Sequence, residues 1–104
     1  QGKNLDEALK LANEANTLQP GNASILDTLG WIHFKQGRMP EAIKCLTESL
    51  KIAPDSPAVC YHLGAAQLAA GNRDQGKETL EKALKLSADF PEAAEVKRLL
   101  STIK

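Results

Sequence analysis

Apolar residues recur along this chain at the three- and four-residue spacing of amphipathic helices, and short polar breaks separate the runs. The clearest run covers residues 23–36, where the apolar positions fit a helical period better than strand alternation, and Gly37 then interrupts it. Five further helices are predicted over residues 5–18, 40–52, 57–70, 73–87 and 91–104. The pattern therefore predicts an all-α chain of six helices, and its short loops favour antiparallel packing of neighbours.

The helical pattern repeats itself every 34 residues. Leu29 and Gly30 recur as Leu63 and Gly64, and Gly37 recurs as Gly71. A fixed period of this length indicates stacked helical units rather than one closed core. We expect a single domain over residues 1–104, divided into a half repeat (1–22, second helix only), a full repeat (23–56), a full repeat with a longer terminal turn (57–92) and a closing helix (93–104).

Small and apolar residues fall at matching places in the two full repeats. In the first they are Leu26, Leu29, Gly30, His33, Ala42, Leu46, Ser49 and Pro54, and in the second Cys60, Leu63, Gly64, Gln67, Gly76, Leu80, Ala83 and Ala88. This series resembles the tetratricopeptide repeat, a helix-turn-helix unit with such a signature. The resemblance implies a right-handed superhelical stack of antiparallel helix pairs, in which glycine and alanine let helices approach closely.

The chain departs from that signature at two places that affect packing. Gly76 stands where alanine is usual, which costs about 0.5 to 1 kcal/mol in helix propensity. The turn at residues 87–92 is longer by two residues. Counting the closing helix from Ala93 rather than Pro91 keeps Lys97 and Arg98 off the buried positions, so we favour this longer turn.

Composition narrows the classes of partner. Thirteen Lys and Arg residues balance thirteen Asp and Glu residues, so no net charge attracts nucleic acid or anionic lipid. No apolar run is long enough for direct membrane insertion. Cys45 and Cys60 form no metal or redox motif, and two free thiols slightly favour a cytoplasmic location. Because the chain starts inside a repeat without Met, we expect a fragment of a longer, bacterial-type repeat protein.

Candidate chemistry is sparse. Residues 71–77 spell GxxxxGK, the start of a phosphate-binding loop, but Glu78 follows where Ser or Thr is required and no strand is predicted before it. His33 and His62 belong to no recognisable triad, and packing or surface roles are favoured for both. We therefore predict a chain that is not an enzyme and has no catalytic residues, metal site or cofactor.

The resemblance implies a concave groove lined by the first helix of each repeat. The second, fifth, ninth, twelfth and thirteenth positions correspond to Ser24, Asp27, Trp31, Phe34 and Lys35, then to Ala58, Tyr61, Ala65, Leu68 and Ala69, and on the closing helix to Ala94, Lys97, Ser101 and Lys104. The chain's only Trp and only Tyr are both in this set, and aromatic side chains are frequent anchors at interfaces. The alternative is that Trp31 packs on a preceding helix or a neighbouring chain.

The predicted function is protein–protein interaction through this groove. The groove residues lack the Lys and Asn pattern with which some family members clamp a terminal carboxylate. An apolar groove with a basic end suits a peptide with apolar side chains and an acidic end. The alternative is a homo-oligomerising structural segment, since the half repeat exposes a helix face. Residues 61–93 are also similar to the ends of bacterial repeat proteins associated with polysaccharide export or assembly.

Overall fold

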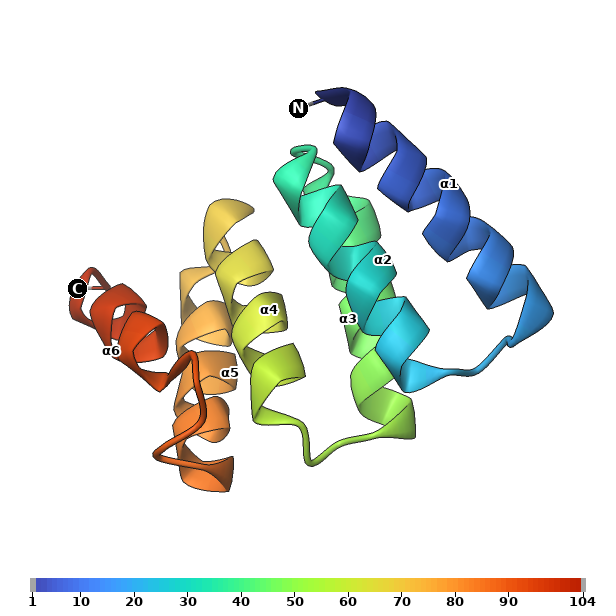
Figure 1. Cartoon of the computed structure of the whole chain (residues 1–104). Coiled ribbons are helices and arrows are strands. Elements are labelled where there is room, and N and C mark those ends of the chain that lie inside the picture. The colour runs from blue at the N-terminus through green and yellow to red at the C-terminus, as the bar shows by residue number, and fades with distance from the viewer. Residues whose placement is uncertain (1, 104) are drawn as a thin grey trace.

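The computed structural model describes residues 2–103 as six helices joined by short turns, with no strand among them (Figure 1). The helices are α1 (Gly2–Leu18), α2 (Ala23–Lys35), α3 (Met39–Ile52), α4 (Pro57–Ala69), α5 (Arg73–Leu86) and α6 (Ala93–Ser101). The predicted all-α architecture is confirmed. α1 begins three residues earlier than the sequence pattern predicts, at Gly2, and α6 ends at Ser101. α6 begins at Ala93, as the longer turn before it implied, and the bounds of the other four helices differ by at most one residue from the prediction. Lys104, expected on the closing helix, lies outside the described residues.

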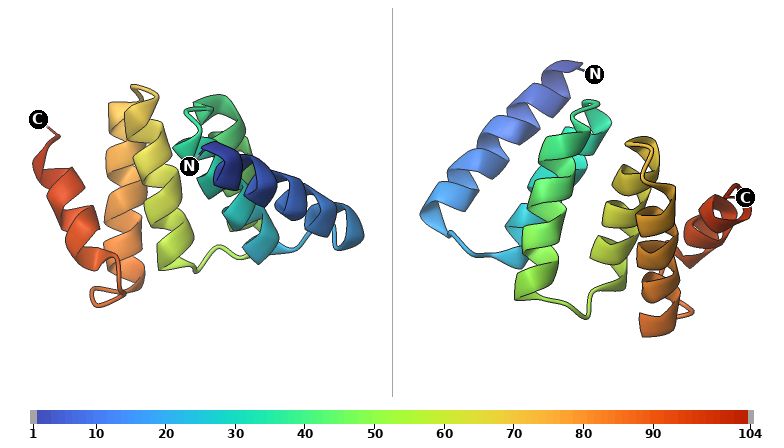
Figure 2. Two further views of the ribbon diagram at one scale, coloured as in Figure 1. Left: turned by 45° about the horizontal axis from the view of Figure 1, so that its top comes forward. Right: turned by 180° about the vertical axis from the view of Figure 1, so that it is seen from behind.

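The helices stack as a row of antiparallel pairs. α2 packs along α3, and α4 packs along α5, while the contact between α3 and α4 joins the two pairs. α1 lies against α2 at one end of the row and α6 lies against α5 at the other, as the views in Figures 1 and 2 show. The reverse view in Figure 2 places α3 and α5 on the opposite side of the stack from α2 and α4.

The turns within the two pairs have the same geometry. Gly37 and Gly71 adopt positive φ angles of 80° and 88°, which glycine tolerates because it has no side chain. The amide of Arg38 donates to the carbonyl of His33 at 2.8 Å, and that of Asn72 donates to Gln67 at 2.8 Å. This is a Schellman motif, which ends α2 and α4 and reverses the chain.

Close helix approach within each pair depends on glycine. A Cβ atom added to Gly30 would lie 2.5 Å from Cγ of Leu46, and one added to Gly64 would lie 2.6 Å from Cγ of Leu80. Leu46 and Leu80 are fully buried, so neither side chain can move aside to make room for an added methyl group. The expected role of these glycines in tight packing is thus visible in the structure.

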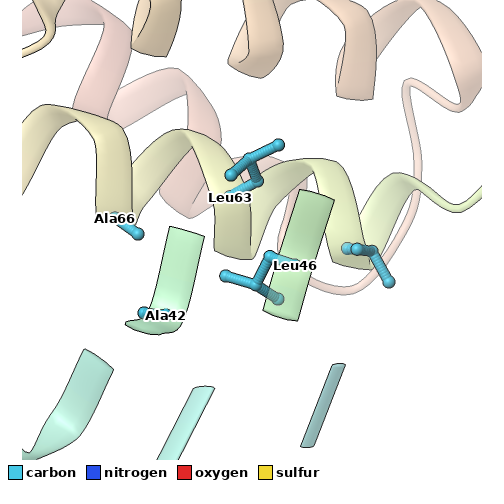
Figure 3. Packing of buried hydrophobic residues seen from close by; sticks show 5 residues of the cluster. Ala42, Leu46, Leu63 and Ala66 are labelled. Carbon is cyan, nitrogen blue, oxygen red and sulfur yellow. The ribbon is translucent and has the colours of Figure 1, made fainter. Parts of the chain in front are cut away.

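The two pairs are joined by an apolar layer. Ala42 and Leu46 of α3 pack with Leu63 and Ala66 of α4, close together in Figure 3. Val59 completes the buried cluster. Because this layer is continuous with the packing inside each pair, the repeats form one body rather than two independent hairpins.

Gly76 has a packing role that its helix propensity does not reveal. A Cβ atom at this position would lie 2.7 Å from Cδ2 of Leu68, on the neighbouring helix α4. In the first repeat the equivalent positions hold Phe34 and Ala42. The missing methyl group at Gly76 therefore makes room for Leu68, which offsets the propensity cost.

The closing helix buries its apolar residues and keeps its charges in water. Val96 is fully buried, whereas Lys97 and Arg98 are exposed. Leu99, Leu100 and Ile103 are half-buried. Within residues 2–103, no helix is both long enough and apolar enough to cross a bilayer.

Candidate binding groove

Residues of α2, α4 and α6 line a cavity of about 450 Å³. Its wall consists of Trp31, Phe34, Tyr61, Ala65, Leu68, Ala69, Glu95, Arg98, Leu99 and Thr102. We call this space the groove cavity. Other hollows along α1 and α3 are each lined by residues of a single helix, most of them polar. The groove cavity is distinct because three helices build it and seven of its ten lining residues are apolar or aromatic.

Trp31 is held in place by stacking inside the chain. The centroid of its ring lies 4.5 Å from that of Phe34, and the two ring planes are within 3° of parallel. The centroid of the His62 imidazole lies 4.1 Å from that of Trp31. Tyr61 approaches at 5.7 Å with its plane tilted by 52°. Trp31 is half-buried and packs on α4 of its own chain, which neither sequence interpretation had assigned as its partner. It shapes the wall of the groove cavity as a fixed aromatic surface.

Asp27 is connected to this aromatic cluster through His62. Nδ1 of His62 donates a hydrogen bond to Oδ1 of Asp27 at 2.7 Å, and both side chains are mostly buried. A carboxylate can only accept, so the proton is on Nδ1 of the imidazole. Asp27 does not line the groove cavity. The predicted groove positions did not include His62, and the signal that could have found it is its spacing from Asp27, one residue longer than the repeat.

The wall on the side of α6 is formed by Glu95, Arg98 and Leu99 of this helix and by Thr102, which directly follows it. Together with the residues of α4 they line one cavity. Arg98 is held by Glu95, with Nε 2.8 Å from Oε1 and Nη2 2.5 Å from Oε2. This hydrogen bonding lowers the pKa of Glu95. The pair places a fixed positive and a fixed negative charge at the rim of the groove cavity.

Tyr61 lines the groove cavity with a neutral phenol side chain. Burial raises the pKa of Tyr61, and the carboxylates of Glu95 and Glu92 raise it further, whereas Arg98 opposes them. The phenol therefore stays protonated at neutral pH and can donate a hydrogen bond. Tyr61 thus combines a large apolar surface with one polar group, a combination favoured at protein interfaces.

The family of this chain follows from its match to models of known protein families. Family models described as tetratricopeptide repeat match residues 34–101 and residues 2–55. The chain belongs to the tetratricopeptide repeat family. Each match covers more than half of the chain, and together the two matches span both full helix pairs and α1. No curated protein sequence matches the chain significantly.

Solved structures share the tetratricopeptide fold with this chain. The TPR2B domain of yeast Sti1, solved in complex with pHsp70, has a TM-score of 0.89 at 21% identity, covering 98% of this chain and 84% of that one. PcrH, in complex with the chaperone binding region of PopD, has a TM-score of 0.86 at 20% identity, covering 99% and 80%. The O-GlcNAc transferase of Thermobaculum terrenum has a TM-score of 0.88 at 22% identity over 95% of this chain, which spans 18% of that enzyme.

The groove positions that the tetratricopeptide resemblance implied differ in burial and in whether they line the groove cavity. Ala65 is buried and forms the floor of the groove cavity. Ser24 and Lys35 are exposed on α2 and do not line it. Lys97 and Ser101 are exposed as well, on the flank of α6 next to the one that lines the cavity. The structure thus brings together Trp31, Phe34, Tyr61, Ala65, Leu68 and Ala69 and leaves the polar positions outside.

The GxxxxGK stretch lies between two helices, which is not the structural context of a phosphate-binding loop. Residues 71–77 form the turn between α4 and α5 and the first turn of α5, so a helix precedes them where a phosphate-binding loop follows a strand. Among residues 2–103, no group of three His, Cys, Asp or Glu side chains is placed to hold a metal. Burial raises the pKa of the Cys45 and Cys60 thiols, which keeps both protonated and poorly nucleophilic.

Proposed function

We propose that this tetratricopeptide chain is a non-enzymatic interaction module that binds a protein or peptide segment in the groove cavity. The observation that carries this proposal is the composition of the cavity wall. Side chains from three helices meet there, and most of them are apolar or aromatic although the cavity is open to solvent. An exposed apolar hollow of this kind favours a partner that covers it.

The chemistry of the wall favours an apolar side chain as the part of the partner that enters. Tyr61, Leu68 and Leu99 surround the space, and burying one Leu or Phe side chain there contributes about 1.5 to 3 kcal/mol. The groove is preformed, because Ala65 is buried beneath it and Trp31 is stacked on two rings. A preformed surface loses little conformational entropy on binding.

Two structural neighbours support this class of function. The Sti1 domain was solved with pHsp70 and PcrH with a region of PopD, so both were solved with a protein partner. The two full repeats lack the Lys and Asn pattern of a terminal carboxylate clamp. Asp27 and Trp31 occupy the corresponding positions of the first repeat, and Tyr61 and Ala65 those of the second. We therefore propose an apolar segment as the ligand rather than a charged chain end.

The test is selection from a random peptide library followed by affinity measurement with groove variants. Peptides selected on the wild-type chain are labelled, and their binding is measured by fluorescence polarisation. We expect Tyr61→Ala and Leu99→Ala to weaken binding by about tenfold or more. Leu11→Ala, which removes an exposed apolar side chain on α1, is the matched control and leaves affinity unchanged. Equal affinity for wild type and both groove variants would show that the groove is not the binding site.

Self-association through α1 is a second candidate. Leu11 is 65% exposed and Leu18 is 82% exposed, so α1, at the end of the stack, leaves two large apolar side chains uncovered. A second copy of the chain that covered this face would bury both. Light scattering over a range of concentrations tests this, because a dimer that Leu11→Ser and Leu18→Ser together abolish would support it. A role in a polysaccharide export or assembly system stays a prediction from the sequence.

A further inference from the structure

A second hollow of about 410 Å³ adjoins the groove cavity. It is lined by Leu68, Arg73, Thr102 and Ile103, and it shares Leu68 and Thr102 with the groove cavity. The two hollows are therefore neighbouring parts of one surface. The second part is formed by Leu68 of α4, by Arg73, the first residue of α5, and by Thr102 and Ile103, which follow α6. The first part is mostly apolar, and the second contains an arginine.

The two arginines on this surface differ in their partners. The guanidinium of Arg98 is held by the carboxylate of Glu95 through two hydrogen bonds. Arg73 is exposed, and among residues 2–103 it has no ion pair and no side-chain hydrogen bond. The neighbouring Asp74 does not line the hollow shared with Leu68. Arg73 is thus the positive group on this surface that is available to a ligand.

We propose that the groove selects segments in which a large apolar side chain is accompanied by an Asp or Glu side chain nearby in the sequence. The apolar side chain fills the groove cavity and the carboxylate pairs with Arg73 in the adjoining hollow. The planar guanidinium of arginine can donate two parallel hydrogen bonds to one carboxylate, which adds geometric selectivity to the charge attraction. This inference rests on the proposed function and adds the charge of the ligand to it.

A side-chain carboxylate fits this surface better than a chain end. A clamp for a terminal carboxylate in this family uses Lys and Asn from the first helices, and those positions of the two full repeats hold other residues here, among them Trp31 and Ala65. Arg73 belongs to α5, a second helix, and supplies a single fork at the edge of an otherwise apolar surface. The single guanidinium of Arg73 next to an apolar cavity matches one carboxylate next to an apolar side chain of the ligand.

The experiment uses short synthetic peptides with an amidated C-terminus. Each peptide has a central Phe in a background of Ser and Ala. Glu, Gln or Lys is placed at each of the remaining positions in turn. Binding to the wild-type chain, Arg73→Gln and Arg73→Glu is followed by fluorescence polarisation. Lys77→Glu is the matched control, because it reverses an exposed charge on the same helix outside both hollows.

We expect Glu at a particular distance from Phe to bind the wild type about tenfold more tightly than Gln. Arg73→Gln should abolish this difference, and Arg73→Glu should reverse the preference toward Lys. The Lys77→Glu chain should keep the wild-type preference. Circular dichroism confirms that each variant is folded. A preference for Glu that survives Arg73→Glu, or no preference in the wild type, would overturn the inference.

Two further comparisons separate this inference from the proposed function. If Phe peptides bind and Tyr61→Ala weakens them while charge has no effect, the assignment of Arg73 is wrong and the groove function stands. If peptides with Phe bind no better than those with Ala, both are wrong. Peptides with a free C-terminal acid form the last arm, since Arg73-dependent binding of these alone would overturn the assignment of a side-chain carboxylate.

Discussion

His62 of α4 donates a hydrogen bond to Asp27 of α2 across a distance of 2.7 Å, and the same imidazole stacks on Trp31. One side chain therefore joins the first helices of two successive repeats and also supports the aromatic wall of the groove cavity. The stability of the array and the shape of its groove are coupled through this contact. Changes at this contact are therefore expected to affect both properties.

Asp27→Ala should destabilise the fold by about 1 kcal/mol, because the imidazole of His62 loses its buried acceptor. The measurement is urea unfolding of Asp27→Ala, His62→Ala and the double variant. The double variant should be more stable than the sum of the single effects predicts, since the two residues interact directly. Asp55→Ala, an exposed residue in the turn before α4, is the control with no expected effect. Simple additivity would mean that the pair contributes nothing.

Trp31→Ala should lower the free energy of unfolding by about 1 to 3 kcal/mol, because it removes stacking on both Phe34 and His62. Chemical denaturation followed by circular dichroism measures this, since the variant has lost the only Trp. Trp31→Phe should recover part of the loss. An unchanged unfolding midpoint for Trp31→Ala would contradict the stacking role and return Trp31 to a purely ligand-binding one.

Gly30→Ala and Gly76→Ala should differ although both add the same methyl group. At Gly30 the methyl meets fully buried Leu46, and we expect a loss of about 1 to 3 kcal/mol from overpacking. At Gly76 it meets half-buried Leu68, which can rotate into the groove cavity, while the helix gains about 1 kcal/mol in propensity. Gly76→Ala should therefore be near neutral in thermal unfolding and should weaken peptide binding. Equal destabilisation by both would contradict this distinction.

Tyr61 should titrate above its unfolded-state value of about 10, because burial and the nearby carboxylates Glu95 and Glu92 raise its pKa. It is the only Tyr, so phenolate absorbance in the near ultraviolet reports it directly. Its contribution to stability is fully present below the unfolded-state pKa and is lost as pH rises through the higher folded-state pKa. Arg98→Gln should raise the pKa of Tyr61 further, since Arg98 opposes the carboxylates. An unshifted titration would indicate a solvated phenol.

Most of the architecture could be predicted from the sequence. Helical periodicity, the 34-residue repeat and glycines such as Gly30 and Gly64 predicted six helices, their pairing and a close approach within each pair. The same repeat placed Trp31, Tyr61 and Leu68 on one face, and these three residues do line a common cavity. Such features are predictable because they depend on local propensity and on a period that each repeat satisfies by itself.

Contacts between successive repeats were decided only by the tertiary structure. The pairing of His62 with Asp27, the side of α6 that faces the cavity and the space that Gly76 leaves for Leu68 all depend on how one helix is rotated against the next. That rotation follows from packing large side chains against small ones across an interface, and it has no signature within a single repeat. The sequence thus determined which residues build each helix pair, and the stacking of pairs decided which of them shape the groove.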